Sequence, residues 1–276
     1  MKQISLNKIE IIKVIAGIKN TENDLLAIEE PLEIKIATSI DNLKIQKSIS
    51  VTMRTPANDA ELALGFLYTE GLISNANQVL KVEENYLFQE NVVLITLQKE
   101  VELDLKNTER NFYTTSSCGV CGKSSIDAVI SKLYRANIST ITTKSSVLIG
   151  LADTLRNSQE VFNKTGGLHA SAIFDNDGKL LYMREDVGRH NALDKVIGYA
   201  FQNNLLPLSN CILLLSGRIS FELVQKAAVA GIAIIAAIGA PSSLAVQLGT
   251  EQNLTLIGFL RGNNYNIYCG SQRIID

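Results

Sequence analysis

The C-terminal part of the chain alternates continuously apolar segments with amphipathic ones. The apolar segments, Cys211–Leu215, Ile232–Ile238 and Leu254–Leu260, have the length of buried strands, and the intervening Phe221–Ala230 and Ser242–Leu248 have the pattern of helices. A strand that is apolar on both sides needs cover on both faces of its sheet, which helical crossovers between parallel strands supply. The pattern therefore predicts an α/β fold whose sheet is largely parallel here.

Three polar loops follow the three predicted strands: Ser216–Ser220, Gly239–Ser243 and Arg261–Asn264. The carboxyl ends of parallel strands lie at one edge of a sheet, and open α/β sheets bind their ligands there. Together the loops would bring Arg218, Arg261, several hydroxyls, glycines and two helix N-termini to that edge. Such a set suits a phosphate or pyrophosphate. The alternative interpretation is three ordinary turns, in which glycine and serine only redirect the chain.

The first half of the chain has the pattern of an α+β unit. We predict a helix that is capped by Asp59. Extended segments separated by turn residues predict one hairpin before this helix and one after it. The four segments are Leu32–Thr38, Leu43–Met53, Val79–Phe88 and Val92–Leu97. We therefore expect a smaller N-terminal α+β part over residues 1–112 and an α/β core, with a mixed sheet covered by helices, over residues 113–276.

A third predicted hairpin, Ala170–Phe174 with Lys179–Met183, leads into a dense polar cluster at residues 184–191. Asn191 at its end is the predicted cap of the next helix. The cluster is either a solvated turn with a good cap or part of a site, in which Arg189 and His190 could contact phosphate or move a proton. The chain has two histidines, and the other, His169, also follows a glycine-containing turn.

Composition narrows the possible functions. The chain has 276 residues, 46% of them hydrophobic, which is ample for a buried core. Its net charge of -2 argues against a general nucleic-acid-binding protein. Four cysteines in a chain of this length fit a reducing compartment, and we expect a cytoplasmic protein. The apolar stretch Ala227–Ala240 is shorter than the roughly 20 residues that span a bilayer, so it predicts a buried helix, turn and strand, with no membrane partner.

Two of the cysteines, Cys118 and Cys121, form a CxxC pair flanked by glycines and followed by Lys123. Ser124 or Ser125 can cap a helix directly after the pair. The helix dipole and the lysine would both favour a thiolate. Cys121 lies nearer the predicted helix start, which favours it as the thiolate on physical grounds.

Several kinds of chemistry use a CxxC pair. Structural zinc needs four ligands, and the remaining cysteines, Cys211 and Cys269, have no close partner in the sequence, so no tightly bound zinc or other metal is expected. Zinc deaminases need a His-x-Glu segment before the pair, and the residue at the glutamate position after His169 is Ser171. A dithiol oxidoreductase would leave the polar loops unexplained. A persulfide carrier, whose acceptor binds at those loops, accounts for both features.

Six segments together resemble the formate dehydrogenase accessory sulfurtransferases, the FdhD family. The resemblance extends from about Arg54 to Tyr268, and its motifs are specific as an ordered set although the CxxC alone is weak. The segments are Ser117–Gly122, Thr165–Ala170, Glu185–Lys195, Ser216–Glu222, Gly239–Ser243 and Phe259–Arg261. The 30 N-terminal residues match nothing specific.

The resemblance implies a sulfurtransferase with a cytidine-deaminase-like α/β core that forms a homodimer. The protein would take persulfide sulfur from a cysteine desulfurase and pass it to the molybdenum bis(molybdopterin guanine dinucleotide) cofactor, which formate dehydrogenase then needs. By position, Cys118 is the persulfide residue, Cys121 is its partner, and both are catalytic. The cofactor-binding stretch comprises Phe259, Leu260, Arg261, Gly262, Asn263 and Asn264.

The residues themselves add further cofactor contacts, since a guanine dinucleotide carries a pyrophosphate. The loop residues Gly217, Arg218 and Ser242 would suit it, as would Arg189 and His190. Two alternatives stay open: a chaperone that binds the molybdenum cofactor without transferring sulfur, and a CxxC dithiol oxidoreductase. The order in which the two cysteines act also stays open, because local physics favours Cys121 as the thiolate and the resemblance favours Cys118.

Overall fold

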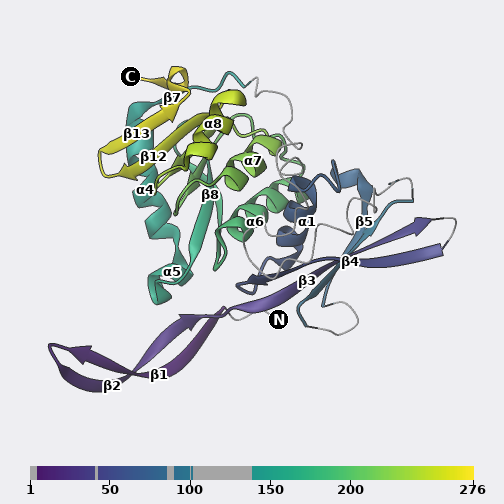
Figure 1. Ribbon diagram of the computed structural model, residues 1–276, viewed down its shortest axis with the longest axis horizontal. Helices are drawn as coiled ribbons and strands as arrows, with labels where there is room; N and C mark the ends of the chain where they lie inside the picture. The colour runs from purple at the N-terminus through teal and green to yellow at the C-terminus, as the bar shows by residue number, and fades with distance from the viewer. Residues whose placement is uncertain (1–4, 41–42, 86–89, 100, 102–138) are drawn as a thin grey trace.

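The computed structural model describes residues 5–40, 43–85, 90–99, 101 and 139–276. A six-stranded mixed sheet forms the centre of the larger part of the molecule (Figure 1), and its strand order is β13-β12-β11-β10-β8-β9. The strands are β8 (His169–Asp175), β9 (Leu180–Asp186), β10 (Cys211–Leu215), β11 (Ile234–Ala237), β12 (Thr255–Arg261) and β13 (Asn264–Cys269). The expected mixed sheet with a smaller N-terminal α+β part is therefore confirmed.

The three apolar strands predicted from the sequence, β10, β11 and β12, are parallel neighbours, so their carboxyl ends share one edge. Strand β8 is antiparallel to β10, and Ser171 near its start pairs with Leu215 at the end of β10. The first residue of β8, His169, pairs with Asp186 at the end of β9. His169 and the segment after Asp186 therefore reach the same sheet edge as the three polar loops.

Helices cover both faces of this sheet (Figure 1). Three helices, α6 (Arg189–Gln202), α7 (Phe221–Val229) and α8 (Ser243–Glu251), pack on one face, and α4 (Ser145–Ser158) packs on the other. Alternate residues of β10 enter the two cores: Leu213 and Leu215 face α6 and α7, whereas Ile212 and Leu214 face α4. This double burial is the reason that the strand is apolar throughout.

A short helix and a small two-stranded sheet complete this part. The helix α5 (Glu160–Thr165) follows α4 directly. The small sheet pairs β7 (Thr143–Lys144) with β14 (Ile274–Ile275), which follows the 3-10 helix η3 (Ser271–Arg273). The chain passes directly from α4 through α5 into β8, whose first residue, His169, lies at the carboxyl edge of the parallel strands.

The N-terminal part has its own four-stranded sheet in the order β4-β3-β6-β5. Its elements are β3 (Glu30–Ile40), β4 (Leu43–Arg54), α1 (Asp59–Thr69), η1 (Ala76–Gln78), β5 (Val79–Glu84) and β6 (Val92–Leu97). Strands β3 and β4 form the first predicted hairpin, and β5 and β6 form the second. The predicted boundary between residues 112 and 113 lies outside the described residues.

Helix α1 joins the two parts by packing across α6 (Figure 1). Its inner face enters a core with the N-terminal sheet, to which Phe201 of α6 also contributes. The predicted cap is wrong in detail: α1 begins after Asn58, and Asp59, in the first turn, is buried and receives two hydrogen bonds from Arg54, with N–O distances of 2.9 and 2.8 Å.

The predicted cap of α6 is also wrong. The helix begins at Arg189 after Gly188, and Asn191 lies inside its first turn. The buried Asn191 amide donates instead to the Met53 carbonyl (2.7 Å) and to the Asp186 carboxylate (3.1 Å). The Asn191 side chain is therefore bound to Met53 and Asp186 and does not cap the helix.

The N-terminal residues form a hairpin, β1 (Leu6–Ile15) and β2 (Ile18–Ala27), that extends away from the rest of the molecule (Figure 1). Its tip carries exposed aliphatic side chains, including Ile12 and Ile18. Among the described helices, none has the length and apolar character needed to cross a bilayer.

Candidate functional site

The three polar loops are joined to one another by backbone hydrogen bonds. The Gly239 amide donates to the Gly217 carbonyl (3.0 Å), and the Phe259 amide donates to the Gly239 carbonyl (3.1 Å). The Ser242 amide also donates to the Ile219 carbonyl (3.0 Å). The prediction that these loops share one edge is therefore confirmed. A Cβ on Gly239 would lie 2.9 Å from the Gly217 carbonyl oxygen, so this close approach needs a glycine.

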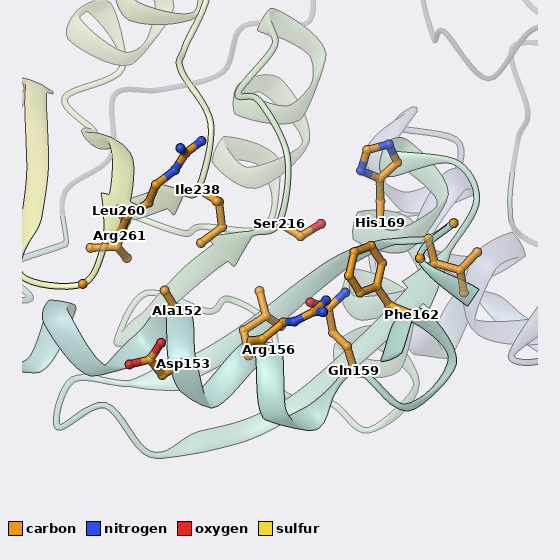
Figure 2. A pocket seen from close by; sticks show the side chains of 15 residues that line it. Ala152, Asp153, Arg156, Gln159, Phe162, His169, Ser216, Ile238, Leu260 and Arg261 are labelled. Atoms are coloured by element: carbon orange, nitrogen blue, oxygen red, sulfur yellow. The ribbon is translucent and has the colours of Figure 1, made fainter. Parts of the chain in front are cut away.

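A cavity of about 570 Å³ opens at this edge, between the sheet and the α4–α5 segment (Figure 2). Residues from five separate stretches of chain line it. They are Ala152, Asp153, Leu155, Arg156, Gln159, Phe162, Gly166, Gly167, Leu168, His169, Ser216, Ile238, Leu260, Arg261 and Gly262. The wall combines apolar side chains with a few polar groups, as is typical of small-molecule sites.

The cavity brings together only some of the residues predicted to bind a ligand. Leu260, Arg261 and Gly262 line it. The other predicted residues are not part of its lining: Phe259, Asn263, Asn264, Gly217, Arg218, Ser242, Arg189 and His190. Several of them lie close by, since a Cβ on Gly217 would be 3.3 Å from the Nδ1 atom of His169, which does line the cavity.

His169 is the titratable group at the centre of this edge. Burial lowers the pKa of its imidazole, and the positive charge of Arg189 lowers it further. Arg218 contributes in the same direction, while the Asp186 carboxylate opposes the shift. A neutral imidazole can donate a hydrogen bond from one ring nitrogen and accept one at the other without bringing a further positive charge to this edge.

The other histidine, His190, is buried in the first turn of α6. Its Nε2 atom lies 3.4 Å from the Ser220 hydroxyl and 3.8 Å from the Glu222 carboxylate. The nearby His190 imidazole lowers the pKa of Glu222 to about 2. His190 thus links the start of α6 to the start of α7, and its side chain contacts protein groups at this position.

The dense polar cluster at residues 184–191 proves to be largely a scaffold. Asp186 is fully buried and forms an ion pair of 2.7 Å with Lys195, which is 1% exposed. Arg184 forms an ion pair with Glu61 of α1 and lies over the Tyr199 ring. The interpretation as a solvated turn is therefore wrong for these residues, which tie the core to the N-terminal part.

Glu185 of the same cluster positions the cavity wall. Its carboxylate accepts hydrogen bonds from the backbone amides of Val161 (3.0 Å) and Phe162 (2.8 Å), the second and third residues of α5. Free amides at a helix start need such acceptors. Glu185 therefore fixes α5, and with it Phe162, against the end of β9.

Sequence reasoning missed the α4–α5 wall of the cavity. Arg156, Gln159 and Phe162 come from an ordinary amphipathic helix and the short helix after it, with no motif. A glutamine in a polar stretch gives no sign that it will be buried. Only the packing of α4 on the sheet, through Leu148, places the end of this helix at the cavity.

Phe259, in the predicted cofactor-binding stretch, has an unusual backbone. Its φ is 56° although it is not glycine, and its side chain is 43% exposed. The register between β12 and β13 shifts between Gly258 and Arg261, so the strand bulges at this residue. A left-handed aromatic residue costs conformational energy, which makes such positions candidates for function.

The CxxC pair, Cys118 and Cys121, lies outside the described residues, and so does the helix predicted after it. The other two cysteines, Cys211 and Cys269, are half-buried, and burial raises the pKa of both thiols. They are therefore poor nucleophiles. Within the described ranges, His, Cys, Asp and Glu side chains form no group of three that could hold a metal ion.

Fold and site define an α/β protein with a cavity, flanked by arginines, at the carboxyl edge of its parallel strands. The FdhD/NarQ family model matches residues 27–275, and the chain belongs to this family. The N-terminal hairpin falls almost wholly before the matched residues, which agrees with the lack of any recognisable motif in the first 30 residues.

Curated relatives match over nearly the full length. The sulfur carrier protein FdhD of Streptomyces coelicolor is 45% identical over 277 residues, covering 96% of this chain and 94% of its own. The sulfur carrier protein FdhD of Sulfurisphaera tokodaii is 42% identical over 274 residues, covering 99% and 100%.

A solved structure has the same fold. A crystal structure described as a "putative formate dehydrogenase accessory protein", from Desulfotalea psychrophila, superposes with a TM-score of 0.76 at 21% identity. The match covers 99% of this chain and 100% of that one. At this identity the likeness concerns the fold.

Proposed function

We propose that this protein is a sulfurtransferase that carries persulfide sulfur from a cysteine desulfurase to the molybdenum bis(molybdopterin guanine dinucleotide) cofactor. The observation that carries the proposal is family membership together with the CxxC pair, because relatives at 42–45% identity are sulfur carrier proteins. The cavity beside Arg261 supplies the second requirement, a place where an anionic acceptor can bind.

The CxxC pair supplies the chemistry of both half-reactions. The Cys118 thiolate attacks the outer sulfur of the donor's persulfide, the sulfur–sulfur bond of the donor breaks, and the donor leaves as a thiolate. Attack of the Cys121 thiolate on the inner sulfur of the Cys118 persulfide then releases hydrosulfide and forms a Cys118–Cys121 disulfide. The released sulfur gains two electrons, and the two thiols lose them. A cellular dithiol must reduce the disulfide before the next cycle.

The loops and the cavity are proposed to hold the acceptor. Arg261 lies at the end of β12 and Arg156 at the opposite wall, so two guanidinium groups flank the opening (Figure 2). Guanidinium groups bind phosphate oxygens in a bidentate manner. In this proposal the pyrophosphate of the dinucleotide lies near Arg261 and Gly262, which belong to the predicted cofactor-binding stretch.

The proposed partners follow from the same function. The sulfur donor is a cysteine desulfurase, the acceptor is the guanine-dinucleotide cofactor, and the client is formate dehydrogenase. We expect a cytoplasmic homodimer, with neither nucleic acid nor membrane as a partner.

Sulfur loading of the cysteines tests the proposal. The full chain is incubated with a cysteine desulfurase and cysteine, and intact-mass spectrometry is expected to show added sulfur that maps to Cys118. Cys118→Ala is expected to abolish this adduct and formate dehydrogenase maturation in cells, while Cys211→Ala, which alters a half-buried thiol far along the chain, leaves both intact. Maturation that survives in Cys118→Ala would favour a chaperone without sulfur transfer.

A further inference from the structure

Gln159 has a buried side-chain amide whose N–H donor forms no hydrogen bond with the residues that the structure describes. It lies at the junction of α4 and α5, is 4% exposed, and lines the cavity. Within the part of the chain that the structure describes, its Nε2 atom has no hydrogen-bond partner. A buried donor left without an acceptor is destabilising, so a position of this kind calls for a ligand that supplies an acceptor.

Two residues beside Gln159, Arg156 and Phe162, stack on each other. The Arg156 guanidinium lies over the Phe162 ring, 4.4 Å from its centroid. Figure 2 shows the side chains of Arg156, Gln159 and Phe162 converging on one side of the cavity. Arg156 is an exposed residue that lines the cavity, so its side chain is not closed off by the rest of the protein. Planar heterocycles stack on guanidinium and aromatic groups of this kind.

The position of these residues is fixed by the scaffold. The Glu185 carboxylate holds the first turn of α5 through the backbone amides of Val161 and Phe162, and the Gln159 backbone N–H donates to the Arg156 carbonyl (3.4 Å). The donor and the stacking pair are therefore held together before any ligand binds. Such preorganisation lowers the entropic cost of binding.

We propose that this α4–α5 surface, made of Arg156, Gln159 and Phe162, recognises the purine base of the nucleotide, with Gln159 donating to the carbonyl oxygen at position 6. The inference rests on the proposed function, since it takes the ligand to be a guanine nucleotide. The base stacks against the Arg156–Phe162 pair, and Gln159 is a specificity-determining residue.

Two features favour the base over the phosphates as the group at Gln159. A neutral amide beside an aromatic ring adds no charge, whereas Arg261 lies at the end of β12, on the other side of the cavity (Figure 2). In addition, the buried Gln159 amide donates to a carbonyl oxygen at position 6 of the purine. A purine with an amino group at position 6 would place a second donor against this amide and is therefore rejected. The proposal thus predicts selectivity for 6-oxopurines.

Nucleotide titrations with the full chain test this selectivity. Isothermal titration calorimetry with guanosine, inosine and adenosine diphosphates compares the group at position 6 with the group at position 2. The wild type is expected to bind the guanosine and inosine nucleotides with similar affinity, and the adenosine nucleotide at least tenfold more weakly. Equal binding of the adenosine nucleotide would overturn the assignment of Gln159.

Substitutions of Gln159 measure its own contribution to nucleotide binding. Gln159→Leu is expected to weaken guanosine diphosphate binding by about three- to tenfold, the value of one neutral hydrogen bond, and to remove most of the preference over adenosine diphosphate. Gln159→Glu, nearly isosteric, places a charged acceptor beside the carbonyl and is expected to weaken binding more. Gln247→Leu, on the exposed face of α8, is the matched control and leaves binding unchanged.

The outcomes distinguish this inference from the proposed function. If no variant and no wild-type sample binds guanosine diphosphate, the nucleotide site itself is absent and the proposed function fails with it. If the wild type binds it and Gln159→Leu, shown by its thermal melt to be folded, binds equally well, the base lies elsewhere and only the inference is overturned.

Discussion

Gly65 of α1 and Gly198 of α6 lie against each other where the two helices cross. A Cβ on Gly65 would overlap the Asp194 carbonyl oxygen and lie 2.8 Å from the Gly198 amide nitrogen, and a Cβ on Gly198 would overlap the Glu61 carbonyl oxygen. The atoms in the way are backbone, which cannot rotate aside. The two glycines therefore set the distance between the N-terminal part and the core.

Gly65→Ala is expected to destabilise the protein by about 1–3 kcal/mol or more, because the added methyl group forces the helices apart. Denaturant unfolding measures the change. The matched control is Gly150→Ala in α4, where nothing lies within 4 Å of the added Cβ. Alanine there is expected to stabilise by about 0.5–1 kcal/mol through its helix propensity. Equal effects at the two positions would mean that the helices do not touch as described.

The strands around the site were predictable because burial leaves a simple sequence pattern. Strand β10 is apolar at every position since both of its faces are covered, and the same holds for β11. Loops that follow such strands must lie at one edge, so the meeting of Gly217 and Gly239 followed from topology alone. The same topology predicts that Arg218 and Arg261, which belong to these loops, lie at that edge.

The elements that the sequence did not predict depend on contacts that no local pattern records. Asn191 has the side chain of a cap, but Asp186 and Met53 bind it inside the fold. Hairpin β1–β2 turns at Ala16-Gly17, both with positive φ, and alanine is not a residue that signals such a turn. Gln159 becomes part of the cavity only when α4 packs on the sheet.

The buried ion pair between Asp186 and Lys195 gives a second prediction. Asp186 also accepts from the Thr55 amide (3.1 Å) and the Gly188 amide (2.8 Å), while Lys195 donates to the Thr55 carbonyl (2.8 Å). Asp186→Asn leaves the Lys195 charge buried without its counterion. We expect a loss of about 3–5 kcal/mol in the free energy of unfolding.

The control for this loss is a pair at the surface. Lys81 and Glu83 lie 2.8 Å apart with side chains that are 63% and 31% exposed, and such pairs contribute little because water and salt screen them. Glu83→Gln is expected to leave the denaturation midpoint within experimental error. A comparable loss in both variants would contradict the role of burial.

The titration of His169 gives a third prediction. Burial and the nearby positive charges of Arg189 and Arg218 lower its pKa, so an NMR titration is expected to place the midpoint of His169 below the ordinary value of 6.5. With only two histidines in the chain, His190→Gln assigns the signals. Guanosine diphosphate is expected to raise the His169 midpoint, because its negative charge stabilises the imidazolium. Sodium chloride at equal ionic strength serves as the control.

The same shift has a consequence for stability. Below pH 6.5 the unfolded chain takes up a proton at His169 more readily than the folded chain does, so stability falls as the pH drops from 7 toward 5. His169→Asn is expected to flatten this part of the stability profile. A profile unchanged by the substitution would show that the His169 pKa is not lowered in the folded protein.

The backbone of Phe259 gives the last prediction. A bulky residue in the left-handed region costs about 1–2 kcal/mol, and glycine adopts that region freely. Phe259→Gly is therefore expected to raise the free energy of unfolding by about 1 kcal/mol while weakening nucleotide binding, because the exposed ring in the predicted cofactor-binding stretch is lost. Asn204→Gly, at a φ of 56° that asparagine tolerates, is the control and is expected to change stability less. Calorimetry measures the free energy of unfolding and the affinity for guanosine diphosphate in each variant. Loss of stability in Phe259→Gly would show that the ring is held for packing rather than for a ligand.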